Sequence, residues 1–225
     1  MASFNGIKKK INEKLFRFRK KRNLSKFEWL SGEKSKISIL SCNCIGGVLM
    51  NEYNMTFMTP TVNFFMTPLD FLVFVENLEK YLDADIHLSK DANDVLLPYP
   101  VFYLGDLKIF AVHYKTLEEF ISSWNRRKVR INKDNIFVIF TDRDGFDPSI
   151  MSRIDALPYR KVMFSHLPYP KYDWVCYIKG FEKEEEIIPL TDYIGITGKR
   201  WYSKYPFTKV FSEMSKVNKC NKILI

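Results

Sequence analysis

The chain has 225 residues, of which 46% are apolar and 16% aromatic, enough to bury the core of one large domain. It lacks a run of roughly 20 apolar residues that could span a bilayer, and its first residues lack a secretory signal, so we expect a cytoplasmic protein. Its four cysteines form no C-x-x-C pair, which argues against a disulfide framework and against a structural zinc site.

Positive charge is concentrated at the start of the chain. Residues 1–36 hold 12 Lys and Arg against three Glu, an excess that equals the whole net charge of +9. The rest of the chain is balanced in charge, so nucleic acid is an unlikely partner.

The basic segment also has an apolar stripe at helical spacing, made of Ile7, Ile11, Leu15 and Phe18. We predict that residues 1–35 form a basic amphipathic helix or arm, and that residues 36–225 form a single α/β domain. Such a helix can make peripheral contact with an anionic membrane at the inner face of the cell membrane, through residues 7–30. A solvated helix or disordered arm is the equal alternative.

From residue 36 onward, predicted strands alternate with predicted helices. We expect strands near residues 37–41, 101–104, 107–112, 136–140, 162–164 and 174–178. Capping signals begin helices at Thr67, Thr116 and Asp147, and apolar spacing continues the first of these to Leu82. A further helix is expected at residues 207–217. The fold class is therefore α/β, as a three-layer Rossmann-like mixed sheet with helices on both faces, the hairpin at residues 101–112 supplying the antiparallel strand.

Four predicted strands end in groups able to do chemistry. The groups are residues 42–47, His113, residues 141–145, and Ser165 with His166. Parallel strands share one edge at their carboxyl ends, and α/β proteins bind ligands there. We therefore expect these groups to line one cavity, although an antiparallel strand would carry His113 to the other edge.

Asp142 and Asp144 follow the strand at residues 136–140. Two carboxylates at a strand end can hold Mg²⁺ or Mn²⁺ against the phosphates of an activated donor, and Arg143 between them can contact a phosphate. Asp-Arg-Asp-Gly is also ordinary turn chemistry, since Asp caps its own backbone and Gly accepts a positive φ.

Cys44 is a candidate nucleophile at the start of a short predicted helix. Exposed backbone N–H groups would stabilise its thiolate, and His113 or His166 could complete the activation as acid or base. Gly46 and Gly47 could alternatively bring backbone amides close to a phosphate. The simplest interpretation is a buried cysteine beside a glycine turn.

Arg126 and Arg127 close the helix that begins at Thr116. Cations there complement the negative end of the helix dipole, and this effect explains most of the basic residues at this helix end. Together with Arg143 they could instead recognise an anionic substrate, because the guanidinium fork matches phosphate and carboxylate oxygens.

Several blocks together resemble a family of bacterial proteins, the exopolysaccharide biosynthesis proteins that contain domain of unknown function 1919. The blocks are residues 41–47, which include Asn43; residues 60–64, which include Asn63; and residues 68–71, 113–114, 124–127, 130–132, 141–145, 166–170 and 179–181. This chain has Cys42 and Ile45 where the family pattern has asparagine and tryptophan. The resemblance implies surface-glycan assembly. Asn43 and Asn63, which lie in these blocks, are further candidate substrate-binding residues.

The leading hypothesis is a transferase of capsule or exopolysaccharide synthesis that uses a nucleotide-activated sugar. Asp142 and Asp144 would lie near a metal, Arg126, Arg127 and Arg143 would neutralise phosphate, and His113 or His166 would act as base. One alternative is a cysteine-dependent acyltransferase or hydrolase that modifies glycans, with Cys44 as nucleophile. Another is a non-catalytic glycan-binding or assembly protein.

Overall fold

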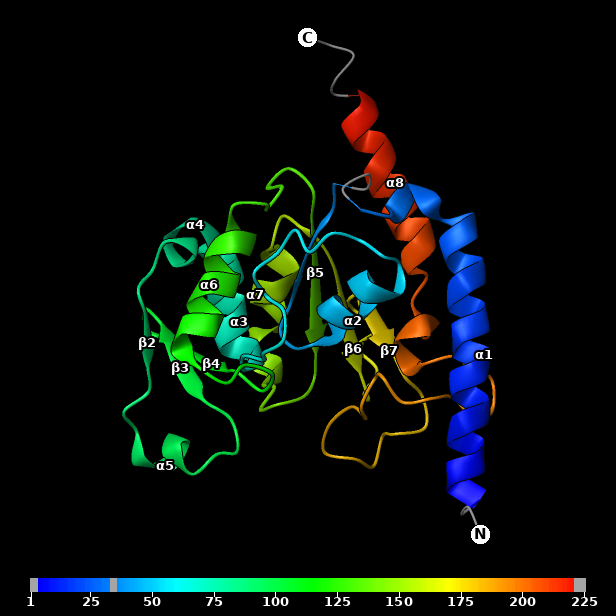
Figure 1. The fold of residues 1–225 in the computed structure, drawn as a ribbon, viewed down its shortest axis with the longest axis horizontal. Helices are drawn as coiled ribbons and strands as arrows, with labels where there is room; N and C mark the ends of the chain where they lie inside the picture. The colour runs from blue at the N-terminus through cyan, green and yellow to red at the C-terminus, as the bar shows by residue number, and fades with distance from the viewer. Residues whose placement is uncertain (1–3, 33–35, 221–225) are drawn as a thin grey trace.

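A computed structural model of the chain describes residues 4–32 and 36–220 and shows a mixed α/β protein with two separate sheets (Figure 1). The first sheet has four parallel strands in the order β1-β5-β6-β7, which are β1 (Ser38–Ser41), β5 (Ile136–Thr141), β6 (Arg160–Ser165) and β7 (Val175–Tyr177). The second sheet is antiparallel, with strands β2 (Ile86–Leu88), β3 (Val101–Leu104) and β4 (Leu107–Phe110).

The predicted hairpin is present as β3 and β4, but it does not join the parallel strands. Its partners are β2 on one side and the backbone of Phe65 on the other, where two hydrogen bonds of 3.0 and 2.9 Å connect Phe65 with Phe110. The next residue, Met66, donates from its N–H to the carbonyl oxygen of Cys42 at 2.8 Å. The segment at residues 63–66 therefore lies between the two sheets, and the one mixed sheet expected from the sequence is divided in two.

The helices expected after Thr67 and Thr116 begin there, and the one expected after Asp147 begins as a 3₁₀ turn. The helices are α1 (Phe4–Lys26), α2 (Ile45–Glu52), α3 (Pro68–Glu76), α4 (Leu78–Leu82), α5 (Ala92–Val95), α6 (Leu117–Lys128), α7 (Met151–Ala156) and α8 (Phe207–Cys220), with 3₁₀ turns at Glu28–Leu30, Pro148–Ile150 and Trp201–Lys204. The hydroxyl oxygens of Thr67 and Thr116 accept from the N–H groups of Asp70 and Glu119, as N-caps do. The single helix expected up to Leu82 is broken at Asn77, whose φ of −125° is not helical.

The parallel sheet has an apolar core on each face. All six residues of β5 are buried, and their side chains alternate between the faces. Leu40, Val138 and Phe140 pack toward α3, α4, α6 and the small sheet. Phe137, Ile139 and Phe164 pack toward α2 and α8. Each fully buried large apolar side chain contributes about 1.5–3 kcal/mol, so the two cores hold β5 rigidly and fix the position of its carboxyl end.

Helix α1 runs along the edge of the molecule beside α8 (Figure 1). Its buried Asn12 donates from Nδ2 to the carbonyl oxygen of Gly195 at 2.8 Å, and Oδ1 accepts from the N–H of Gly198 at 2.9 Å. Lys20 donates to the side chain of Asn51. The helix thus rests on the body of the protein, while the predicted boundary at residue 35 adjoins residues 33–35, which lie outside the described residues.

The described residues contain no helix long and apolar enough to cross a membrane. Cys42, Cys44 and Cys176 are free thiols, and the side chain of Cys220 lies outside the part of the chain that the structure describes.

Candidate functional site

Three of the four predicted strand-end groups meet at the carboxyl edge of the parallel sheet. β1 leads into Asn43 and Cys44, β5 into Asp142, and β6 into His166. Asn43 donates from Nδ2 to the hydroxyl oxygen of Thr141 at 2.9 Å, which ties the end of β1 to the end of β5. The shared edge follows from the parallel pairing of these strands.

Asp142 and His166 form a buried pair, with His166 Nδ1 2.7 Å from Asp142 Oδ2. The same oxygen accepts from the hydroxyl of Ser165 at 2.6 Å and from the N–H of His166 at 2.8 Å. Oδ1 accepts from the N–H of Ile187 at 3.1 Å. Both carboxylate oxygens are therefore occupied by protein donors, and the pair fastens β5, β6 and the segment around Ile187 together.

Asp144, two residues further on, has a different environment. Its φ of 59° lies in the left-handed region, and its half-buried side chain has no hydrogen-bond partner among the described residues. Burial raises the pKa of this carboxyl, Arg143 opposes that rise, and the charge of Glu186 adds to it. An unpartnered carboxylate with a raised pKa at a pocket wall is suited to accept a proton.

Arg143 holds the loop in place. Its guanidinium forms an ion pair with Glu186 at 2.7 Å and donates to the carbonyl oxygen of Ile187. Glu186 in turn accepts from the N–H of Asp144 at 3.0 Å. Arg143 thus positions Asp144, and its charge is largely used within the protein.

In this conformation the two carboxylates differ in what they offer a divalent cation. Asp142 would have to exchange protein donors for the metal, since both of its oxygens are engaged. The described residues also include no group of three or more His, Cys, Asp or Glu side chains arranged to hold a metal ion.

Two pockets meet at Cys44. One, the Asp144 pocket, has a volume of about 230 Å³ and includes Asn43, Cys44, Thr141, Arg143 and Asp144 in its wall. The other, the His113 pocket, has a volume of about 350 Å³ and includes Cys44, Gly47, Asn63 and His113. His113 and Cys44 therefore line one pocket, even though β4 belongs to the other sheet.

The segment at residues 63–66, between the two sheets, contacts both His113 and Cys44. The N–H of His113 donates to the carbonyl oxygen of Asn63 at 3.3 Å, and the Cys44 thiol contacts the carbonyl oxygen of Phe64 at 3.8 Å. Asn63 has a φ of 69°, and both Asn63 and His113 are exposed. These two polar side chains are accessible to a ligand in the His113 pocket.

Cys44 is a poor thiolate. Burial raises the pKa of its thiol to about 11, and the nearby charge of Asp144 adds to the rise. The Cys44 thiol makes no hydrogen bond to a histidine within the described residues.

The two glycines of α2 are explained by packing. A Cβ at Gly46 would lie 2.8 Å from Cβ of Ser41, and one at Gly47 would lie 3.2 Å from a methyl of Val62. Gly46 is buried against β1, whereas Gly47 lines the His113 pocket. Close contact of the helix with its neighbours therefore accounts for both glycines.

The arginines of α6 differ from each other. Arg126 is exposed and lines neither pocket. Arg127 donates to the hydroxyl of Tyr114 at 2.8 Å and lies over the ring of Phe57, 5.5 Å from its centroid. Because Phe57 lines the His113 pocket, Arg127 lies behind that wall.

Sequence reasoning missed several residues of the pockets. Thr141 receives the hydrogen bond of Asn43, and Phe16, Phe57 and Arg200 line the His113 pocket. Thr141 belongs to the strand-end group at residues 141–145, but its hydrogen bond to Asn43 was not expected. The others come from α1 and from loops without a motif, so only the folded chain reveals them.

Comparisons with known proteins identify a family and a relative. A family model described as "Domain of unknown function (DUF1919)" matches residues 11–212. A protein of Haemophilus influenzae with the name "Uncharacterized protein" is similar to this chain, with 32% identity over 213 residues that cover 94% of this chain and 99% of that protein.

Proposed function

The chain belongs to the DUF1919 family, a family of unknown function, and from the geometry of its site we propose that it is a transferase of bacterial surface-polysaccharide assembly, transferring a sugar from a nucleotide-activated donor. The link to exopolysaccharide rests on the sequence resemblance. The reaction type rests on the site. A Rossmann-like relationship is part of the same proposal, supported by four parallel strands between two apolar cores.

The observation that carries the proposal is the junction of the two pockets at Cys44. It sets the carboxylate of Asp144 on one side and the side chains of Asn63 and His113 on the other. Sugars present many hydroxyl groups, so a site for them needs hydrogen-bonding side chains and a group that accepts a proton. Both requirements are met by accessible side chains here.

Asp144 is the general base in this proposal. It takes the proton from the acceptor hydroxyl while that oxygen forms a bond to the sugar carbon, and the bond to the leaving diphosphate breaks. The raised pKa of Asp144 favours this role, because a base works best when its pKa is nearer the working pH. Asn63 and His113 orient the sugar, and Arg143 holds the base in position.

A role for Mg²⁺ or Mn²⁺ stays a prediction, and no step of the proposed reaction passes through a metal. Catalysis by Cys44 has less support, since its raised pKa leaves little thiolate at neutral pH. Asp142 and His166 serve as the anchor beneath the site.

The proposal is tested by complementation in a bacterium that makes exopolysaccharide and lacks its own copy of the gene. Asp144→Asn and His113→Gln should each lower surface glycan at least tenfold, while Cys44→Ser should retain it. Asp147→Asn, in the same loop but exposed and acting as a helix cap, is the matched control and should behave as wild type. In the purified protein, the rate of donor turnover should fall as the pH is lowered, because a protonated Asp144 cannot act as a base. The midpoint of this fall should lie above 3.8, the ordinary pKa of Asp.

Other outcomes would favour the alternatives. Loss of glycan in Cys44→Ser alone would indicate the cysteine-dependent acyltransferase or hydrolase. Full glycan production by folded Asp144→Asn and His113→Gln proteins would indicate a non-catalytic glycan-binding or assembly protein.

A further inference from the structure

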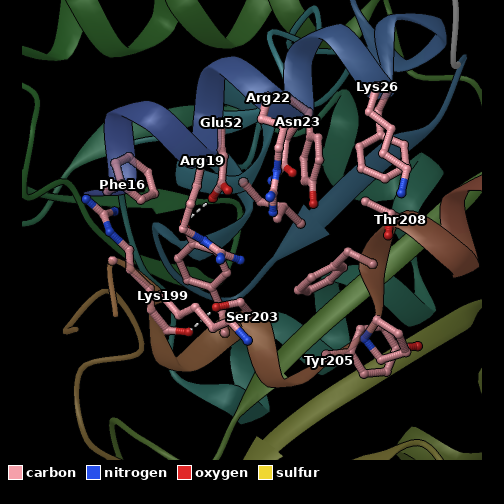
Figure 2. Close-up of a pocket in the computed structure, with 18 residues that line it drawn as sticks. Phe16, Arg19, Arg22, Asn23, Lys26, Glu52, Lys199, Ser203, Tyr205 and Thr208 are labelled. Carbon is pink, nitrogen blue, oxygen red and sulfur yellow. Dashed lines mark hydrogen bonds between the residues drawn. The ribbon is translucent and has the colours of Figure 1, made fainter. Parts of the chain in front are cut away.

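A third and larger hollow lies between α1, the end of α2 and the segment at residues 198–208 (Figure 2). We call it the basic cavity; its volume is about 540 Å³. Five cationic side chains line it: Arg19, Arg22, Lys26, Lys199 and Arg200. No feature of the sequence singled out this set, because its members come from opposite ends of the chain.

The cations of the basic cavity are not neutralised by the protein. Within residues 4–32 and 36–220, none of the five forms an ion pair with a carboxylate. The single carboxylate in the wall, Glu52, accepts a hydrogen bond from the hydroxyl of Tyr202. Unpaired cations around a hollow raise the local potential and attract an anion.

Part of this wall is rigid. The Arg200 guanidinium lies over the ring of Phe16 at 4.3 Å and over that of Tyr193 at 5.4 Å, measured to the ring centroids. Asn12 and Gly198 hold α1 against the same loop. A site whose cations are already in place loses less entropy when a ligand binds.

We propose that the basic cavity binds a nucleoside diphosphate, with the cations of α1 and of residues 199–200 around its phosphates. The volume falls in the range of sites for small organic ligands and exceeds what one phosphate needs. Half-buried rings of Phe27 and Tyr205 line the cavity and offer surface for a flat base. The amino end of α8, at Phe207 and Thr208, adds a favourable dipole.

The cavity also adjoins the candidate site, since Phe16, Glu52 and Arg200 line both it and the His113 pocket. A nucleotide in the basic cavity would direct its terminal phosphate and sugar toward His113. This inference deepens the proposed function and rests on it for the choice of donor, but binding is measured without turnover.

The experiment is isothermal titration of the full chain with UDP, ADP and inorganic pyrophosphate in about 0.15 M salt, where charges more than about 8 Å apart are screened. Arg19→Glu with Arg22→Glu should weaken nucleotide binding at least tenfold. The matched control is Lys10→Glu with Arg17→Glu, which makes the same charge change on exposed positions of the same helix and should change binding less than twofold. Lys199→Glu should also weaken binding tenfold, and it tests the cavity without altering α1.

Three results would overturn the inference: no nucleotide binding by the wild type, equal weakening in the control, or pyrophosphate binding as tightly as UDP and ADP. Each variant is compared at equal helix content by circular dichroism. Nucleotide binding that persists in Asp144→Asn, together with a lack of transfer by the wild type, would defeat the proposed function and leave the inference standing.

Discussion

Asp142 and Asp144 stand two positions apart after β5, and their surroundings give them opposite roles. The carboxylate of Asp142 is buried and receives donors on both oxygens, whereas that of Asp144 is half-buried and unpartnered within the described residues. The sequence predicted that both matter but treated them alike. The difference depends on Ser165 and Ile187, which meet Asp142 only in the folded chain.

At Asp142 we expect a loss of stability upon substitution. Asp142→Asn replaces acceptor lone pairs with an amide that faces buried donors, so it should lower the free energy of unfolding by about 1–3 kcal/mol. Urea denaturation followed by circular dichroism measures this, with Asp147→Asn as a control expected within about 0.5 kcal/mol of wild type. An unchanged midpoint for Asp142→Asn would show that the network is not a structural anchor.

At Cys44 we expect slow alkylation. Its pKa of about 11 lies two units above the ordinary 9.0, so below pH 9 its thiolate fraction should be about a hundredfold lower than that of an ordinary thiol. Because a more basic thiolate is also more nucleophilic, its reaction with iodoacetamide should be about tenfold slower. Peptide mass spectrometry over a pH series follows the reaction, and free cysteine supplies the reference rate. Rapid labelling at pH 7 would revive the cysteine-dependent alternative.

At the scale of elements, the predictions that succeeded rest on local signals. Thr67 and Thr116 cap α3 and α6 as expected, and the apolar runs became β1, β5 and β6. Local signals did not reveal the three-residue strand β2 or the division into two sheets. That division depends on hydrogen bonds between Phe65 and Phe110, which are distant in sequence.

The candidate site shows the same limit. Strand ends predicted that Cys44, Asp142 and His166 lie at one edge of the sheet, because parallel strands share an edge. The placement of His113 and Cys44 in one pocket depends on backbone bonds of the segment at residues 63–66, whose position between the sheets no local signal predicted. Backbone hydrogen bonds between distant segments, rather than residue type, therefore determine where His113 lies.

The docking of α1 can be tested with two glycines of one loop. Gly195 and Gly198 both have positive φ, 57° and 62°, but only a Cβ at Gly198 would meet α1, at 2.6 Å from Cβ of Leu15. Gly198→Ala should therefore displace α1 and speed tryptic cleavage within residues 8–26 at least fivefold over Gly195→Ala. The second variant carries the same backbone strain, so equal cleavage rates would mean that the contact does not hold α1.

At the scale of the molecule, α1 has two unlike faces. Asn12 and Phe16 face the body and Leu15 borders it beside Gly198, whereas Ile7, Ile11 and Phe18 are exposed, Phe18 at 68%. Lys10, Lys14, Arg17 and Lys21 are exposed on the same helix. An exposed apolar stripe with basic neighbours is typical of helices that lie on anionic membranes.

We expect binding to vesicles that contain phosphatidylglycerol, with a contribution of about 1 kcal/mol from each basic residue near the surface. Ile11→Ser with Phe18→Ser should reduce co-sedimentation at least tenfold, and 0.5 M salt should weaken it further. Val129→Ser removes an apolar side chain that is 78% exposed elsewhere and should leave binding unchanged. Binding that ignores salt and lipid charge would contradict this interpretation of α1.

The loop against which α1 packs lies far along the chain, since the hydrogen bond from Asn12 to Gly195 spans 183 residues. During translation at about 5–20 residues per second, the helix leaves the ribosome roughly 10–40 s before the loop that receives it. Over that interval Asn12 lacks both of its partners, Gly195 and Gly198. A nascent chain stalled before residue 195 should consequently stick to anionic lipid or to chaperones through both sides of the helix, and released full-length protein through only one.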